Sequence, residues 1–371
     1  MENTLKRLSI ANYHGFKNEI TLDFSATKDY SYNVDLVQNK VVKNALIYGK
    51  NGSGKSSLCK AIMDITLHLL DKEKDSSTPP HTYFYIGNEE KIATFKYVFQ
   101  FGKDEVEYCY KKSAPTEMVY ESLVVNGKTQ VIHDFVDESQ NFIRLEEAAT
   151  LQTKGLQKEL SVIKYIYTNT IKQENSIIDK LFTFVSGMLY FRSLQQANEY
   201  IGYKVGSDKL EDAIIRAQKL SDFNKFLNDM DLHYDLHPAK MVTGEQIIIA
   251  LIDKKPVDFQ SIMSSGTKML ELFYYWSMEF EKLSFLVIDE FDAYYHYDTA
   301  QAILKLMYRY GNMQTVMSTH GITLMNNKIT RPDCCYIIDS NTTVKNLCNC
   351  TEKTIRQINN LEKMYRDGEF T

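Results

Sequence analysis

The residues Gly49-Lys50-Asn51-Gly52-Ser53-Gly54-Lys55-Ser56 match the phosphate-binding pattern G-x-x-x-x-G-K-[ST] at every fixed position. Glycines in this pattern let backbone amides curl around phosphate groups, and the lysine brings a positive charge to the β- and γ-phosphates of a nucleotide. The serine hydroxyl is a ligand for magnesium, and the helix that follows directs its positive end at the same anion. We expect nucleotide contacts from Gly49, Asn51, Gly52, Ser53, Gly54, Lys55, Ser56 and Ser57, and a magnesium contact from Ser56.

A second motif, residues 285–290, places four apolar residues before Asp289 and Glu290. Such a run is typical of a central strand in a parallel sheet, which delivers its last residues to the edge where phosphates bind. There Asp289 would hold magnesium through water, and Glu290 would polarise the attacking water. The alternative is a solvated strand end with no catalytic task. The presence of the glycine-rich loop favours the catalytic interpretation.

The third motif, Ser264-Ser265-Gly266-Thr267-Lys268, precedes a segment in which Leu272, Phe273, Trp276 and Phe280 recur at helical spacing. A Ser-Gly turn at the start of a helix is an anion site. Because the glycine-rich loop already holds one nucleotide, we expect this turn to contact a second nucleotide. The alternative is a plain helix N-cap without a ligand.

A fourth feature is His320, which follows the strand-like residues 316–319 and lies thirty-one positions after Asp289. One helix and one strand fit into that interval, so His320 could reach the same sheet edge as Glu290. We therefore expect Lys55, Glu290 and His320 to form the catalytic group. A histidine at a strand end is also often purely structural, and that alternative stays open.

The elements needed to position these residues can be read from the pattern of apolar residues. Residues 4–24 are predicted to form two strands around a turn at His14-Gly15, and residues 41–48 a third strand before the glycine-rich loop. The spacing of Leu58, Ile62, Ile65 and Leu69 predicts an amphipathic helix after the loop. Short aromatic-rich strands separated by glycine turns then predict an antiparallel meander, at residues 94–101, 106–110 and 122–125.

The middle of the chain is poor in glycine and has helical periodicity from about residue 140 to 235, which predicts a helical insertion. Strands and helices alternate again from residue 241. The predicted fold is therefore an α/β ATPase head with an N-terminal lobe at 1–139, the insertion at 140–235 and a C-terminal lobe at 236–371. Aromatic residues of the insertion could either anchor a partner or fill its own core; they are Tyr165, Tyr167, Phe182, Phe184, Tyr190 and Phe191.

Composition narrows the classes of function. The chain has 371 residues and a net charge of -5, which provides no general attraction for a polyanion such as DNA. The amino terminus lacks the apolar region of a signal peptide, and the apolar stretch 181–194 is too short and too interrupted to cross a bilayer. Cys334, Cys335, Cys348 and Cys350 lack the spacing of zinc knuckles. We expect a soluble cytoplasmic protein that has no membrane partner.

Together, and in this order, the four motifs resemble the ABC ATPase superfamily. The resemblance identifies them as Walker A, signature, Walker B with its catalytic glutamate, and switch histidine, with Asp292 in the D-loop. It implies ATP and Mg²⁺ as cofactors. It also implies ATP hydrolysis at a dimer interface, where Ser264, Ser265 and Gly266 of one copy complete the site of another.

Within that superfamily the chain resembles the AAA-type ATPases of bacterial anti-phage and abortive-infection systems, relatives of the OLD, RloA and AriA ATPases and more distantly of Rad50 and RecF. The resemblance rests on Ser264-Ser265-Gly266-Thr267-Lys268, on Asp289-Glu290-Phe291-Asp292-Ala293, and on two terminal motifs, Asn12-Tyr13-His14-Gly15-Phe16 and Leu361-Glu362-Lys363-Met364-Tyr365. It implies an antiviral sensor or scaffold that forms a homodimer or larger oligomer and controls a nuclease or toxin.

The chain departs from these relatives at several positions. His14 stands where an arginine is common, and Gly321 follows His320 where an aspartate is common. The motifs do not locate a Q-loop glutamine, and Gln100 at a strand end is only weakly indicated. No TOPRIM nuclease segment follows the head, so the effector, of TOPRIM type by this resemblance, would be a separate chain.

Two other functions remain as alternatives. A DNA-repair ATPase similar to RecF or Rad50 would clamp DNA directly and would need a basic groove, for which Lys111-Lys112 and Lys254-Lys255 provide little. A transporter subunit would carry a much shorter segment in place of the helical insertion. DNA and a phage protein remain open as further partners.

Overall fold

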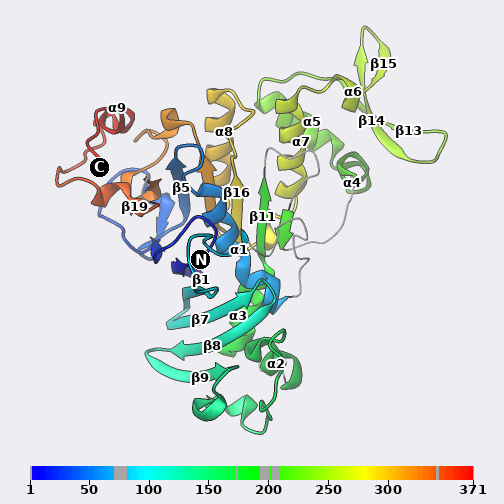
Figure 1. Ribbon diagram of the computed structural model, residues 1–371. Coiled ribbons are helices and arrows are strands. Elements are labelled where there is room, and N and C mark those ends of the chain that lie inside the picture. Colours follow the sequence, from blue (N-terminus) through cyan, green and yellow to red (C-terminus); the bar gives the residue numbers. More distant parts are fainter. Residues whose placement is uncertain are drawn as a thin grey trace.

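The computed structural model describes residues 2–70, 82–171, 174–192, 200–202, 209–339 and 342–370. Two seven-stranded sheets form most of the molecule, one mainly parallel and one antiparallel, and helix α1 (Lys55–Leu69) packs between them (Figure 1). No helix in these ranges is long and apolar enough to cross a membrane. The observed class is α/β, as predicted.

The mainly parallel sheet has the strand order β12-β11-β16-β17-β5-β18-β19. Its five inner strands are parallel and its two edge strands, β12 and β19, are antiparallel. Alternate residues of each inner strand face two different cores, which is why β5, β11, β16 and β18 are mainly apolar. The central strand β17 also buries Gln314, Thr315, Ser318 and Thr319. The bounds are β5 Asn44–Gly49, β11 Met188–Arg192, β12 Tyr200–Gly202, β16 Phe285–Asp289, β17 Gln314–Thr319, β18 Cys335–Ile338 and β19 Val344–Asn346.

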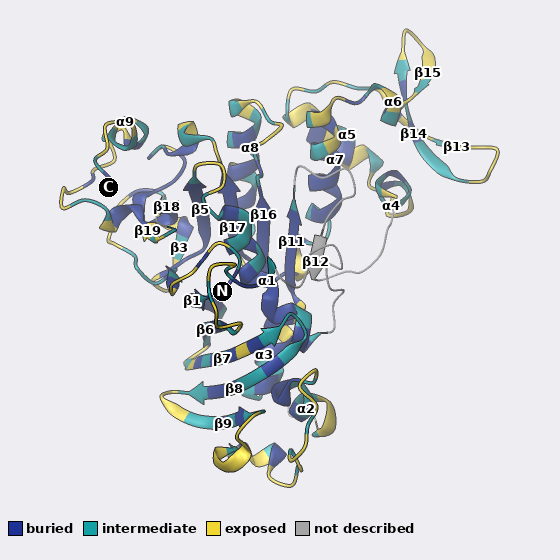
Figure 2. Ribbon diagram, in the orientation of Figure 1, coloured by how far each residue is buried: buried dark blue, intermediate teal, exposed yellow. Residues whose placement is uncertain are grey.

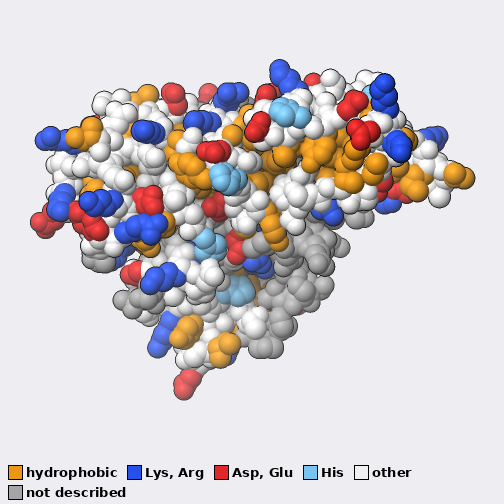
Figure 3. All heavy atoms as spheres, turned by 90° about the horizontal axis from the view of Figure 1, so that it is seen from above, with side chains coloured by type: hydrophobic (Ala, Val, Ile, Leu, Met, Phe, Trp, Pro, Cys, Tyr) orange, Lys and Arg blue, Asp and Glu red, His pale blue; other side chains and the backbone are white. Residues whose placement is uncertain are grey.

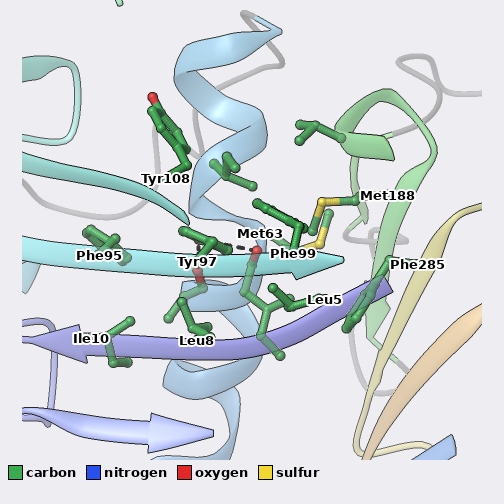
Figure 4. Packing of buried hydrophobic residues seen from close by; sticks show 14 of the residues in the cluster. Leu5, Leu8, Ile10, Met63, Phe95, Tyr97, Phe99, Tyr108, Met188 and Phe285 are labelled. Atoms are coloured by element: carbon green, nitrogen blue, oxygen red, sulfur yellow. Dashed lines mark hydrogen bonds between the residues drawn. The ribbon is translucent and has the colours of Figure 1, made fainter. Parts of the chain in front are cut away.

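The antiparallel sheet confirms the predicted meander and extends it to seven strands in the order β10-β9-β8-β7-β6-β1-β2. Tyr97 and Phe99 of β6 lie over α1 and β1, and they pack with Met63, Leu5 and Phe285 (Figure 4). The bounds are β1 Asn3–Ala11, β2 Ile20–Asp23, β6 Ala93–Phe101, β7 Asp104–Ala114, β8 Glu117–Val125, β9 Lys128–Asp134 and β10 Phe142–Ile143.

Helix α1, predicted as an amphipathic helix, is buried on more than one side. Even a charged residue of this helix, Asp64, is buried. It forms an ion pair of 2.6 Å with the equally buried Lys112 of β7. The hydroxyls of Tyr83 and Tyr110 also donate to this carboxylate, at 2.9 and 2.8 Å. The helix that follows the glycine-rich loop is therefore tied to the antiparallel sheet by a fully paired buried charge.

The block 140–235, predicted to be a helical insertion, also contains strands. Its described residues form four α-helices, but β11 and β12 join the parallel sheet and β10 joins the antiparallel sheet. Phe182, Phe184, Tyr190 and Phe191 are buried, so most of the aromatic residues considered as interface anchors fill the core. The helices are α2 Val162–Asn169, α3 Ile177–Ser186, α4 Leu210–Arg216 and α5 Leu220–Asp229.

The remaining elements complete the second face of the parallel sheet and two smaller sheets. Helices α7 (Ser265–Ser277) and α8 (Tyr297–Met307) contribute to the core there, whereas the sheet of β13, β14 and β15 projects from the body (Figures 1 and 2). Its middle strand β14 still buries Ile248 and Ala250, while β13 and β15 carry most of its exposed residues. The other bounds are β3 Val37–Gln38, β4 Val41–Val42, β13 Leu236–Lys240, β14 Gln246–Ile252, β15 Lys255–Asp258, α6 Phe259–Ile262 and α9 Leu361–Arg366.

Candidate active site

The glycine-rich loop connects the end of β5 to the start of α1. Gly54 is the N-cap of α1 and has a φ of 102°, and Gly52 has a φ of 77°, so both have a conformation that side chains disfavour. A Cβ atom on Gly49 would lie 2.4 Å from Oγ of Ser53. The glycines are therefore required by the curl of the loop, as the motif predicts.

Lys55, the first residue of α1, is buried, and its amine folds back over the loop. Nζ donates hydrogen bonds to the carbonyl oxygens of Gly49 at 2.7 Å and Lys50 at 3.1 Å. Burial lowers the pKa of this amine, and the carboxylates of Asp289 and Glu290 oppose that shift. The lysine charge is thus held at the loop by backbone oxygens and lies in the field of both acidic residues.

Asp289 and Glu290 mark the end of β16. Asp289 is fully buried and accepts a hydrogen bond of 2.5 Å from the hydroxyl of Ser318 on β17. Glu290 has a φ of 53°, an uncommon conformation for a residue other than glycine, and its N–H donates to the same hydroxyl at 2.8 Å. This turn directs the two successive carboxylates into the site.

His320 directly follows β17 and reaches the same edge of the sheet. Its Nδ1 lies 3.3 Å from Nζ of Lys55, and its Nε2 lies 3.9 Å from Oε1 of Glu290. The three residues expected to form the catalytic group are therefore brought together, although they are far apart in sequence. Figure 3 looks toward this side of the molecule from above, where histidine and acidic side chains lie near the middle of the face.

Asp292 joins the loop after β16 to the loop after β17. Its Oδ2 accepts a hydrogen bond of 2.6 Å from Oγ1 of Thr319, and a Cβ atom added to Gly321 would lie 2.5 Å from that same oxygen. Burial raises the pKa of Asp292, against hydrogen bonds from Thr319 and Gly321 that lower it. The close approach explains why glycine follows His320 in this chain.

Residues 45–326 match the family model described as "AAA domain, putative AbiEii toxin, Type IV TA system". The match covers the glycine-rich loop, both carboxylates and His320, and it extends over more than half of the chain. The chain belongs to this AAA-domain family. Nucleotide binding by a P-loop is the property that membership implies.

No curated protein matches the sequence of this AAA-domain chain. Among solved structures, similar chains include the SMC head domain from Thermotoga maritima, with 15% identity, a TM-score of 0.45, and coverage of 92% of this chain and 97% of that one. Another is the Smc head domain bound to the C-terminal domain of ScpA derived from Pyrococcus furiosus, with 14% identity, a TM-score of 0.46, and coverage of 92% and 96%.

The Ser-Gly turn of this AAA-domain chain lies before α7. Ser264 is the N-cap of α7, and its hydroxyl accepts a hydrogen bond of 3.1 Å from the N–H of Thr267. A Cβ atom on Gly266 would lie 3.0 Å from the carbonyl oxygen of Tyr294, so the turn packs beside the segment that follows Asp292. Residues 264–266 and 49–57 are all described, and no hydrogen bond or ion pair joins the two groups within this chain.

The motifs missed Arg192, the last residue of β11. Its Nη2 lies 3.1 Å from Oε2 of Glu290, and its Nε lies 3.7 Å from Oδ2 of Asp289. The signal available in the sequence was the apolar run 188–191 followed by a charge, the same pattern that identified Asp289. Helical periodicity on both sides of this run concealed it.

Two residues considered at the sequence level have other surroundings in the structure. Burial lowers the pKa of His14 to about 4, so its ring is neutral near pH 7 and provides no basic contact. Gln100 belongs to β6 in the antiparallel sheet, and its amide donates to the carbonyl of Gly102 at the following turn. Gln100 is therefore anchored at a hairpin and is not a Q-loop residue.

The residues at the loop fit a bound magnesium nucleotide. Oγ of Ser53 is buried and has no hydrogen-bond partner among the described residues, which leaves a donor available to a phosphate oxygen. The carboxylate of Asp289 and the hydroxyl of Ser56 are the hard oxygen ligands that magnesium prefers. A cavity of about 890 Å³ adjoins the loop and is lined by residues 50–53 and by Asp339, Tyr365 and Arg366. The terminal motif 361–365 thus lies beside the phosphate loop. The lining of the cavity does not include Lys55, Ser56, Asp289, Glu290 or His320, so the cavity itself does not mark the proposed catalytic group.

Proposed function

We propose that the chain is an ATPase that binds Mg²⁺-ATP at the loop between β5 and α1 and hydrolyses it there. The observation that carries this proposal is the convergence of Lys55, Glu290 and His320 at one edge of the parallel sheet, next to the buried Asp289. The AAA-domain family supports nucleotide binding. The hydrolytic step rests on the positions of the acidic residues.

Each side chain has a distinct task in the proposed reaction. Lys55 provides the positive charge for the phosphates, and Ser56 with Asp289 would hold magnesium, which supplies further neutralisation of phosphate charge when bound. Glu290 orients and polarises the attacking water as a general base. His320 lies between Glu290 and Lys55, with a hydrogen bond to Lys55 and a longer separation of 3.9 Å from Glu290, so it can respond to the positions of both groups.

Calorimetric titration with ATP tests the first step. We expect saturable binding by the wild type in the presence of Mg²⁺. Lys55→Ala should abolish it, because the variant lacks the only side-chain cation that is hydrogen-bonded to the loop backbone among the described residues. Lys60→Ala, on the same helix one turn further on, is the matched control. Equal ATP affinity in Lys55→Ala and wild type would contradict the proposal.

We also propose that hydrolysis occurs in a homodimer or larger oligomer, with Ser264, Ser265 and Gly266 of one copy completing the site of another. The turn is exposed at Ser264 and Ser265 and makes no hydrogen bond to the loop of its own chain, which supports a contact to a second copy. The proposed division of the chain, with lobes at 1–139 and 236–371 around the block 140–235, keeps the two halves of this composite site on different lobes.

The biological role that we propose is a sensor or scaffold ATPase of anti-phage defence or abortive infection, acting on a separate nuclease or toxin. The resemblance of the motifs to such ATPases supports this role, and so does a family description that refers to a toxin of a toxin–antitoxin system. Co-purification with the product of the neighbouring gene, with and without ATP, tests it. A chain that binds no such product under either condition would contradict a separate effector.

A further inference from the structure

Arg192 is placed next to the Asp-Glu pair by strand register. It ends β11, and its register partner in the parallel pair of β11 with β16 is Asp289. Two of its guanidinium nitrogens approach Oε2 of Glu290, Nη2 at 3.1 Å and Nε at 3.4 Å. One guanidinium group therefore faces both successive carboxylates.

The carboxylate of Glu290 depends on Arg192 for its position. Its backbone is fixed by the bond from its N–H to Ser318, but three side-chain torsions remain free to rotate. The other ion-pair partner of Glu290 among the described residues is His320, whose Nε2 lies 3.9 Å from Oε1 of Glu290. Without Arg192, the carboxylate would have no close hydrogen-bond donor among the described side chains.

The charges of Asp289 and Glu290 give a second reason for the pairing of Arg192 with Glu290. Asp289 is fully buried and the side chain of Glu290 is only 13% exposed, so two adjacent carboxylates share a poorly hydrated space. Like charges in such a space repel each other. An arginine stays protonated at every physiological pH and has a fork of donors that matches carboxylate oxygens. Arg192 offsets this repulsion while holding Glu290 in one orientation.

We propose that Arg192 is a positioning residue for ATP hydrolysis, which holds the carboxylate of Glu290 toward His320 and Lys55. This inference rests on the proposed function, because Glu290 needs a fixed orientation only if it acts on water. Arg192 would not be required for nucleotide binding. Its effect would be confined to turnover.

The first test compares Arg192→Met and Arg192→Lys with wild type in ATP turnover and in calorimetric ATP affinity. We expect Arg192→Met to lower kcat roughly tenfold to a hundredfold, a part of the effect of a general base, while ATP affinity stays within about twofold. Arg192→Lys should recover part of kcat, because it restores the charge without the fork. Arg216→Met removes an exposed pair with Asp212 and should leave both quantities unchanged.

The second test repeats Arg192→Met in a Glu290→Asp background, in which the shortened carboxylate no longer reaches the guanidinium group. If Arg192 acts through Glu290, its removal should change kcat much less in this background than in the wild type. Equal effects in both backgrounds, or an unchanged kcat in Arg192→Met, would overturn the proposal. If Arg192→Met melts well below wild type, Arg192→Lys carries both comparisons.

The same measurements distinguish an error in the proposed ATPase function from an error in the role of Arg192. A folded wild-type chain that binds ATP without turnover would refute the proposed ATPase, and any role of Arg192 in turnover with it. An active wild type with an equally active Arg192→Met variant would refute the Arg192 proposal alone.

Discussion

At the scale of single residues, the loops after β16 and β17 constrain each other through very short distances. Asp292 and Gly321 leave no room for a methyl group between them, because the added Cβ would lie 2.5 Å from a carboxylate oxygen. That oxygen already accepts a hydrogen bond from Thr319. A side chain at position 321 must therefore displace the D-loop aspartate or the residue that follows His320.

We expect Gly321→Ala to lower ATP turnover about tenfold and to cost about 1–3 kcal/mol of stability, the usual range for overpacking. The physical cause is the displacement of Asp292, beside which the proposed catalytic residues lie. Turnover and the melting temperature measure the two effects. Gly311→Ala is the matched control, since an added Cβ there would have no neighbour within 4 Å. Equal turnover and equal melting temperatures for Gly321→Ala and Gly311→Ala would contradict a role for the close contact between Gly321 and Asp292.

Residues whose chemistry depends on local sequence could be predicted from it. Glu290 and His320 were found because each directly follows an apolar strand, and parallel strands end at one edge of their sheet. Arg192 follows an equally apolar strand, yet the run 188–191 has helical sequence on both sides and no turn residue precedes it except Gly187. The partner of a carboxylate across a sheet depends on register, which one sequence does not reveal.

At the scale of elements, the antiparallel sheet is joined to α2 through a buried carboxylate. Glu121 of β8 accepts hydrogen bonds from Tyr108, from the hydroxyl of Ser161 and from the N–H of Val162. Burial raises its pKa from the usual 4.5 to about 7, although these hydrogen bonds lower it. A raised folded-state pKa means that the folded protein binds this proton more tightly than the unfolded chain does.

The stability that Glu121 contributes is fully present below pH about 4.5 and is lost as pH rises through about 7. We expect the unfolding free energy of wild type to fall relative to that of Glu121→Gln between pH 5 and 7.5, measured by denaturant titration. Burial also raises the pKa of Glu271 to about 7, but Glu271 is present in both proteins. Its contribution therefore cancels when the unfolding free energy of Glu121→Gln is subtracted from that of wild type. A difference that does not vary with pH would contradict the raised pKa, and Glu117→Gln on the same strand is the control.

The meander and the unit of β5, loop and α1 were predictable because glycine turns and aromatic alternation are local signals. The double burial of α1 was not, because the face that contacts β6 and β7 carries Asp64 and would be read as polar. Its charge is satisfied by Lys112, about fifty residues later, and by the hydroxyls of Tyr83 and Tyr110, through the folding of the antiparallel sheet. Long-range pairing of this kind has no local pattern.

At the scale of the whole molecule, both ends of the chain build one sheet, since β5 lies between β17 and β18. The phosphate loop and the Ser-Gly turn therefore belong to one body without touching each other. In the proposed oligomer, the loop of one such body and the turn of another contact one nucleotide. This arrangement makes the proposed oligomer testable by mixing variants.

We expect Lys55→Ala and Ser265→Asp each to be inactive alone, and their mixture to regain at most about a quarter of wild-type turnover. A mixed dimer contains one intact composite site, formed by the loop of one chain and the turn of the other. Ser265 is exposed, so this substitution avoids the clash that a side chain at Gly266 would make with Tyr294. Mixed dimers that form and remain inactive would contradict a site shared between chains.

The most direct test of the central claim, that Glu290 activates water for hydrolysis of ATP bound at the loop, is Glu290→Gln. We expect ATP affinity to be retained and turnover to fall at least about a hundredfold, because the amide cannot act as a base but preserves the size of the side chain. Sedimentation with ATP should show the Glu290→Gln variant accumulating as a species larger than the wild type. The control is Glu281→Gln, at an exposed position just before β16, which should behave as wild type. Turnover by Glu290→Gln at the wild-type rate would contradict the claim.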